Sequence, residues 1–175
     1  MRERRGTQEH RRNRDFEAFV AGAGGRLLHT ATLLTAEAPD DNPRARRLLT
    51  LALAHTYACW DRLRGDDPYD HAREDLAARF AHGAWHRYRP RYRALPFGRG
   101  RPRTADGALA RLTPRQRLVL VLRLYEGVAE EQVGALLGLP DDRVRAVCER
   151  AAATLLRPPG DPAPAVRPAK EAAAS

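Results

Sequence analysis

Cysteine, lysine and aromatic residues are all scarce in this chain of 175 residues. Its two cysteines, Cys59 and Cys148, form no CxxC pair, which excludes a disulfide scaffold and favours a reducing cytosol. No stretch approaches the ~20 apolar residues of a membrane span, and no apolar signal-peptide core follows the basic first residues. We therefore expect a cytoplasmic protein without membrane association. Lys170 is the only lysine, so nearly all positive charge comes from arginine.

The composition is that of a folded protein, with 43% hydrophobic and 30% charged residues. The formal net charge is +9, and the basic residues are concentrated in two segments. Residues 1–14 carry six arginines against two acids, and residues 85–103 carry seven arginines and no acid. Such blocks are typical of solvated tails or of nucleic-acid contacts.

Apolar residues recur with helical periodicity and no strand pattern is found, so the sequence predicts an all-α protein. Two small helical domains, at 15–89 and 106–156, are expected to be joined by a basic linker at 90–105. Residues 1–14 are expected to form a disordered basic arm, with a first helix from Asp15 that the glycines at 21–25 interrupt or bend. The proline- and alanine-rich tail 157–175 is also expected to be disordered.

The C-terminal segment has the pattern of a helix-turn-helix. Thr113-Pro114 predicts a helix start, and a short helix over 130–138 is followed by a glycine-containing turn and an amphipathic helix over 141–156. The outward face of the last helix and its flanks carry Asp142, Arg143, Arg145 and Arg150. In such units the second helix lies in the major groove, where arginine contacts phosphates or guanine edges. A plain helical bundle with a solvated last helix is the alternative.

This segment resembles region 4 of the sigma-70 family, in its extracytoplasmic-function (ECF) group. The resemblance rests on Leu112, Arg115 or Arg117, Glu126-Gly127, the V-G-x-L-L-G run at 133–138, Val144-Arg145 and Arg150-Ala151. It implies a helix-turn-helix that binds the minus-thirty-five promoter element and touches RNA polymerase.

Residues 15–89 resemble sigma region 2 of actinobacterial ECF factors, through DFEAFV at 15–20, AHTYACWDRL at 54–63 and AWHRYR at 84–89. In the family this region melts and holds the minus-ten element. Unpaired bases stack on aromatic rings while arginine contacts the backbone. The resulting candidates for DNA binding are Trp85, Arg87, Tyr88 and Arg89. The alternative is that the Trp is a core residue and the basic end of the helix is simply solvated.

A helix is predicted over 43–63, because Asn42 precedes Pro43 as a helix cap precedes its first residue. The family's polymerase-binding run falls on residues 45–51, where Arg47 and Thr50 replace the usual acidic and amide side chains. Arg47, Thr50 and Tyr57 lie on the outward face of this helix and are the candidate polymerase contacts. An arginine opposite a polymerase surface that suits an acid disfavours the family's usual contact.

The sequence gives little support for a metal site or for catalysis. His55 and Cys59 form one i, i+4 pair and His82 and His86 another, which together could ligate zinc. The spacing matches no finger pattern and the first pair falls on the predicted apolar face, so we expect no metal. No nucleophile has a base at readable spacing and no Gly-rich phosphate loop occurs, so we expect neither an enzyme nor a cofactor.

The sequence is thus interpreted as an ECF-like sigma factor with core RNA polymerase and promoter DNA as partners, and with an anti-sigma factor as a further candidate partner. One alternative is a sigma-derived helix-turn-helix regulator, or polymerase accessory protein, that does not initiate alone. The other is a helical protein-interaction module whose basic segments bind an acidic partner. DNA binding through phosphates would weaken steeply with salt, which separates the last from the others.

Overall fold

The computed structural model describes residues 2–63, 65–88 and 107–157; of residues 2–5 and 85–88 it describes the backbone alone. All regular structure in these ranges is helical, apart from one isolated bridge between Ala38 and Asp41. The predicted all-α class is therefore confirmed. The predicted linker 90–105 and nearly all of the predicted tail lie outside the described residues.

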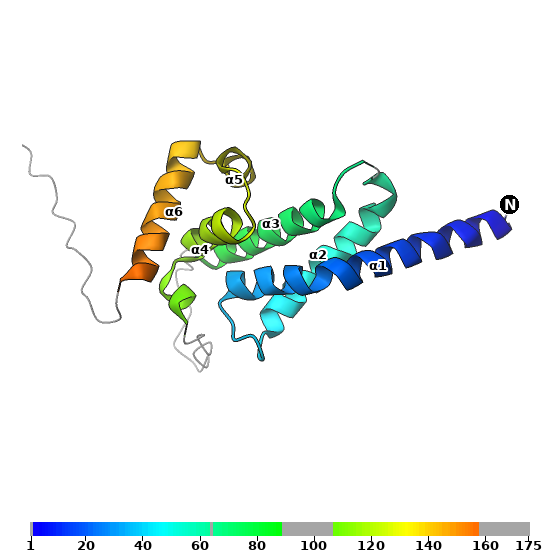
Figure 1. Cartoon of the computed structure of the whole chain (residues 1–175), viewed down its shortest axis with the longest axis horizontal. Coiled ribbons are helices and arrows are strands. Elements are labelled where there is room, and N and C mark those ends of the chain that lie inside the picture. Colours follow the sequence, from blue (N-terminus) through cyan, green and yellow to red (C-terminus); the bar gives the residue numbers. More distant parts are fainter. Residues whose placement is uncertain (1, 64, 89–106, 158–175) are drawn as a thin grey trace, which may run out of the picture.

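The first helix, α1, runs from Arg2 to Thr35, and its first turns project beyond the other helices (Figure 1). The expected disordered arm at 1–14 is therefore wrong, and the glycines at 21–25 do not end the helix. Contacts that the sequence could not show hold this part of α1 in place. The Arg12 guanidinium lies 4.2 Å from the centroid of the Tyr57 ring and donates to the Tyr57 carbonyl at 2.9 Å. Such contacts offset the roughly 1 kcal/mol that each helical glycine costs.

Helix α2 (Pro43–Cys59) begins where Asn42-Pro43 predicted, but the Asn42 side chain does not cap it. Glu37 does so instead, because its carboxylate accepts hydrogen bonds from the backbone N–H groups of Arg44 at 3.2 Å and Ala45 at 2.8 Å. A carboxylate at a helix N-terminus satisfies free N–H groups and complements the helix dipole. A short 3-10 turn, η1 (Trp60–Arg62), continues from α2 and leads to α3 (Pro68–Tyr88).

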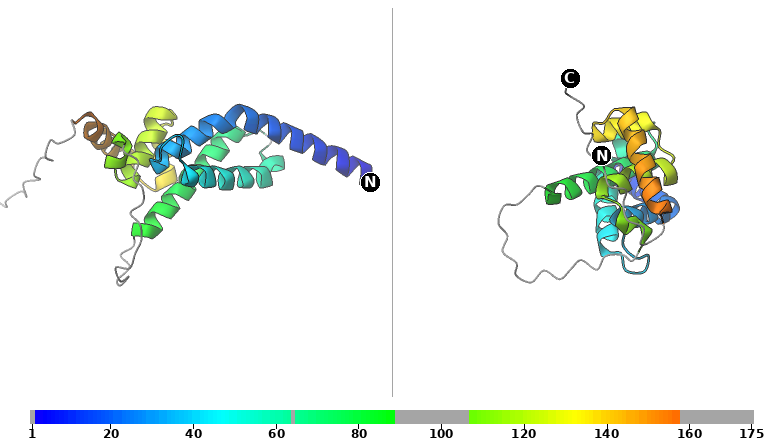
Figure 2. Two further views of the ribbon diagram at one scale, coloured as in Figure 1. Left: turned by 90° about the horizontal axis from the view of Figure 1, so that it is seen from below. Right: turned by 90° about the vertical axis from the view of Figure 1, so that its left-hand side faces the viewer.

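Helices α1, α2 and α3 pack against one another, and the remaining helices lie at the end of this group that is remote from the start of α1 (Figures 1 and 2). These are η2 (Ala108–Arg111), α4 (Pro114–Leu120), the π-helical turn η3 (Val121–Tyr125), α5 (Glu130–Leu137) and α6 (Asp141–Leu156). Thr113 and Gln116 form a reciprocal capping box at the start of α4.

Helices α5 and α6 form the expected helix-turn-helix. Gly138, at the end of α5, has a φ of +63°, a left-handed conformation that glycine adopts without strain. The turn also requires glycine at position 134, because a Cβ atom there would lie 2.6 Å from the Leu139 carbonyl oxygen. The turn can therefore fold back against α5 only if residue 134 has no side chain.

One apolar cluster contains residues from both predicted domains. Its members include Ala31, Leu34, Leu76, Ala77 and Phe80 from α1 and α3, and Leu118, Val119, Leu122, Val133 and Val144 from α4, η3, α5 and α6. Leu112, Leu120 and Ala151 form a second, smaller cluster. The division into two domains stays a prediction, and the structure adds that the two sets of helices share a core.

Candidate nucleic-acid interface

Helix α6 presents one apolar and one polar face, as the sequence predicted. Val144, Val147 and Ala151 are buried, at 0%, 6% and 0% exposure. The predicted DNA-binding residues Asp142, Arg143, Arg145 and Arg150 are all exposed. Packing against α4, α5 and η2 fixes the orientation of the helix, so its polar face is held outward on a rigid support.

Within this polar face, the Arg145 side chain is held by an ion pair. Its guanidinium donates to the Glu130 carboxylate at 2.8 Å, and Arg123 approaches the same carboxylate at 3.3 Å. The hydrogen bond from Arg145 lowers the pKa of Glu130 and raises the pKa of Arg145. The contact joins the first residue of α5 to α6 and orients the Arg145 side chain.

Two acids, Asp141 and Asp142, occupy the first turn of α6, where they complement the positive end of the helix dipole. They also lower the attraction of this end for phosphate. The side chains of Arg143 and Arg150 form no ion pair among the residues that the structure describes. After the two acids at its start, α6 therefore carries two arginines, Arg143 and Arg150, whose charge is available for a phosphate backbone.

The structure places the other predicted DNA contacts only in part. Trp85, Arg87 and Tyr88 lie in the last turn of α3, and their side chains are outside the description, as is Arg89. These residues stay predicted contacts of the minus-ten element.

The three candidate polymerase contacts differ in their surroundings. Arg47 and Thr50 are exposed on α2. Tyr57 is half-buried under α1, and its hydroxyl donates to the Asn13 Oδ1 atom at 2.6 Å. Phe16 also meets the Tyr57 ring edge-on, at 4.9 Å between centroids. This cover was not predicted, because residues 1–14 were expected to be disordered.

A buried carboxylate joins the two sets of helices. Glu126 follows the π-helical turn η3 and is 8% exposed. It accepts hydrogen bonds from the hydroxyls of Thr30 and Tyr69, the latter at 2.9 Å, and from the Arg26 guanidinium at 3.2 Å. Burial, together with the hydrogen bond to Glu126, raises the pKa of Tyr69. The Glu126-Gly127 pair was visible in the sequence, but its partners on α1 and α3 were not.

Arg117 forms a second polar bridge between the two sets. Its guanidinium is buried, and it donates to the carbonyl oxygens of Leu34 on α1 at 3.0 Å and of Leu112 at 3.1 Å. Helical spacing would put Tyr125 on the same face as the buried Leu118, Val121 and Leu122. Tyr125 is instead 38% exposed and lies beside His29. The wider π turn rotates it away from that line.

Of the four histidine and cysteine residues weighed above as zinc ligands, His55 and Cys59 lie together, and the histidine beside them is His71 instead of His82. His82 follows His71 by eleven residues on α3, which is about 16 Å along a helix. The side chain of His86 lies outside the description. In the parts of the chain that the structure describes, no helix is long and apolar enough to span a bilayer.

Comparison with family models identifies residues 108–155 as a match to sigma-70 region 4, a helix-turn-helix domain. The match spans η2 to α6 and covers about a quarter of the chain. It supports a relationship of these helices with the sigma-70 family and a sigma-factor-like DNA-binding role in transcription. For this part of the chain, promoter DNA and RNA polymerase core are the implied partners. Comparison with curated proteins gives no match.

Proposed function

We propose that the chain is an ECF-like RNA polymerase sigma factor that directs promoter recognition and transcription initiation. The observation that carries the proposal is the sigma-70 region 4 match over a helix-turn-helix whose recognition helix exposes three arginines. The resemblance of residues 15–89 to sigma region 2 supports it, and the helical structure of α1, α2 and α3 is compatible with that resemblance.

In this proposal α6 reads the minus-thirty-five element. Arg145 is the residue best placed for a base contact, because its pairing with Glu130 orients the guanidinium. Arg143 and Arg150 contact phosphates or neighbouring bases, and Asp142 is in reach of a cytosine amino group. Trp85 and Tyr88 stack on unpaired bases of the minus-ten element while Arg87 and Arg89 contact its backbone.

The DNA contacts are tested with a triple variant, Arg143→Ala, Arg145→Ala and Arg150→Ala. We expect sequence preference to be lost and the salt dependence of binding to become shallower, since each lost phosphate contact lowers the slope by about one. Fluorescence anisotropy at several salt concentrations measures both. A control variant, Arg14→Ala, Arg44→Ala and Arg115→Ala, removes the same charge from exposed positions outside α6. Equal effects in the two variants would contradict the role of α6.

Initiation is tested by co-elution with core RNA polymerase. Core binding by the native chain, through the surface that contains Arg47, Thr50 and Tyr57, supports a sigma factor and is followed by promoter transcription in vitro. The comparison variant is Arg47→Asp with Thr50→Gln, which restores an acid and an amide. If only this variant binds, the native chain lacks the polymerase contact and does not initiate alone.

A second candidate function is a sigma-derived DNA-binding regulator or polymerase accessory protein. The contacts of α1 with Tyr57 favour it, because they cover one of the three candidate polymerase contacts. DNA binding by the native chain without core polymerase binding, and without transcription in vitro, is the result that supports this function.

A further inference from the structure

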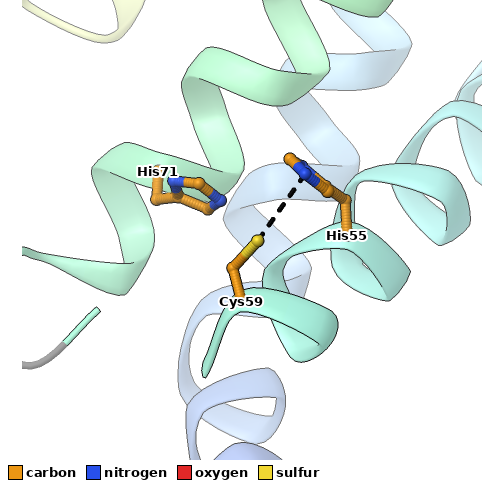
Figure 3. A group of neighbouring side chains, drawn as sticks. All are labelled: His55, Cys59 and His71. Carbon is orange, nitrogen blue, oxygen red and sulfur yellow. Dashed lines mark hydrogen bonds between the residues drawn. The ribbon is translucent and has the colours of Figure 1, made fainter. Parts of the chain in front are cut away.

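We propose that His55, Cys59 and His71 bind a zinc ion at the point where the end of α2 meets the start of α3. His55 and Cys59 are one turn apart on α2, and His71 projects toward them from the first turn of α3 (Figure 3). This site lies in a different part of the molecule from the recognition helix α6. The inference is independent of the proposed function.

The distances suit tetrahedral zinc. The Cys59 Sγ atom and the His55 Nε2 atom are 3.6 Å apart. Zn–S bonds of about 2.3 Å and Zn–N bonds of about 2.0–2.1 Å at a tetrahedral angle also separate the two donor atoms by about 3.6 Å. One ligand atom from each of His55, Cys59 and His71 lies within 4.8 Å of the others, so small side-chain movements complete the set.

His71 gives an independent indication of a ligand. Its Nε2 atom is buried and has no hydrogen-bond partner within the structure described. A buried polar atom without a partner costs about 1–3 kcal/mol, so native proteins rarely leave one unsatisfied. Figure 3 shows the ring of His71 directed toward the space between Cys59 and His55. A metal ion in that space would satisfy the nitrogen.

The surrounding residues form the outer shell that histidine-bound metals usually have. The other ring nitrogen of His55, Nδ1, lies 3.1 Å from the Asp75 carboxylate, which is 15% exposed and also paired with Arg79. This carboxylate fixes the ring so that Nε2 faces Cys59. The Arg62 guanidinium donates to the Cys59 sulfur at 3.3 Å, as an N–H group does to a metal-bound thiolate.

The ligand types select the metal. One thiolate and two imidazoles suit zinc and are poor ligands for magnesium or calcium, which prefer oxygen. The His55 side chain is 44% exposed, so water can reach the fourth coordination position. The His55–Cys59 pair was predicted to face the core, but His55 lies at the surface, which leaves the pair accessible to an ion.

Bound zinc would tie the end of α2 to the start of α3. The ion adds a bond between two helices that also meet through side-chain packing and the contact of His55 with Asp75. Because the ligands must assemble for tight binding, metal binding stabilises the folded N-terminal helices by mass action. Zinc would therefore set the stability of the helix that carries Arg47 and Thr50.

The test uses the full chain, purified under reducing conditions and freed of metal with a chelator. Titration with Co²⁺ reports ligation by sulfur through the thiolate-to-cobalt charge-transfer band, and Zn²⁺ should then displace the cobalt and abolish the band. We also expect Zn²⁺ to raise the Tm of the native chain. Cys59→Ser should remove the band, and Cys148→Ser, the control for the other thiol, should keep it.

Asp75→Asn provides a variant that retains all three ligands. We expect its zinc affinity to fall about 10–100-fold with circular dichroism unchanged, as for other residues that orient a histidine ligand. His71→Ala should weaken binding further. No charge-transfer band in the folded native chain, or a band that survives Cys59→Ser, would overturn the proposal.

Discussion

At the scale of single residues, Glu126 has the most consequential position. Its carboxyl group is fully enclosed, yet three donors from two other helices satisfy it. A buried carboxylate is tolerated only with such partners, and charge-assisted hydrogen bonds are about twice as strong as neutral ones. The residue therefore specifies how η3 docks on α1 and α3. Its loss leaves the Tyr69 hydroxyl without its acceptor, whereas the Thr30 hydroxyl keeps the Arg26 carbonyl oxygen at 3.1 Å.

Replacing Glu126 should therefore destabilise the whole chain. We expect Glu126→Ala to lower the free energy of unfolding by about 1–3 kcal/mol, the cost of leaving buried polar groups unpaired. Urea denaturation followed by circular dichroism measures this change. Glu131→Gln, which alters an exposed acid on α5, is the control and should change stability little. Equal stability of the native chain and Glu126→Ala would show that the bridge contributes nothing.

The Glu130–Arg145 pair should make stability depend on acid pH. The folded-state pKa of Glu130 is lowered, mainly by the Arg145 hydrogen bond, so its unfolded-state pKa is the higher of the two. The pair then stabilises the fold fully above the unfolded-state value of about 4.3, and this contribution is lost as pH falls through the folded-state value. We expect Glu130→Gln to lower Tm at pH 7 and this difference from the native chain to shrink toward pH 3. A difference that is the same at both pH values would contradict the pairing.

The same substitution should tighten DNA binding, if α6 is the DNA-contacting helix. Glu130→Gln removes an acid that repels phosphate, and it releases the Arg145 guanidinium from the orientation proposed for a base contact. We therefore expect a higher affinity for DNA of any sequence, a salt slope steeper by about one and a weaker preference for the specific sequence. Fluorescence anisotropy over a salt series is the measurement, with Glu131→Gln as the control of equal charge. An equal gain in the two variants would indicate a general charge effect.

Local signals allowed some residues to be assigned from the sequence, and distant contacts determined the rest. Thr113-Pro114 marked the start of α4 because a capping box needs only residues within one turn. By contrast, the partners of Glu126 lie 57 to 100 positions away. A distant contact also explains why His71, and not His82, lies beside His55 and Cys59. Helical spacing identified the pair on α2, but only the packing of α3 decides which histidine faces it.

At the scale of elements, α5 and α6 were predicted well because their pattern is local and amphipathic. The buried stripe of Val144, Val147 and Ala151 follows helical spacing, and Gly138 ends α5. Helix α1 was predicted poorly for the opposite reason. Its glycines and arginines disfavour a helix locally, and its contacts with Tyr57 and Asp61 on α2 and η1 are tertiary. Tertiary packing commonly overrides weak propensity in this way.

Two glycine-to-alanine substitutions test the turn between α5 and α6 and the continuity of α1. Gly134→Ala places a Cβ atom 2.6 Å from the Leu139 carbonyl oxygen, so the turn must move, and we expect a loss of roughly 1–3 kcal/mol. Gly22→Ala on α1 meets nothing within 4 Å and should stabilise by roughly 0.5–1 kcal/mol, because alanine favours the helix. Thermal denaturation of both variants is the measurement. Destabilisation by Gly22→Ala would contradict a continuous α1.

At the scale of the whole molecule, the shared core makes the two ends of the chain interdependent. Leu34 on α1 and Val119 on α4 are fully buried in one cluster, and the Arg117 and Glu126 bridges cross the same boundary. Independent domains joined by a linker would instead unfold separately. Because apolar and polar contacts coincide at this boundary, we expect the described helices to unfold as one cooperative unit.

Leu34→Ala tests this coupling, since it removes a fully buried side chain from α1 alone. The cavity should cost about 2–5 kcal/mol. Hydrogen exchange, measured by mass spectrometry, should then show faster exchange in α4 and α6 as well as in α1–α3, because global opening limits protection in a cooperative unit. Leu156→Ala, at an 85% exposed position on α6, is the control and should leave both sets unchanged. If Leu34→Ala loosens only α1–α3, the C-terminal helices are stable by themselves and the shared cluster is a contact between independent domains.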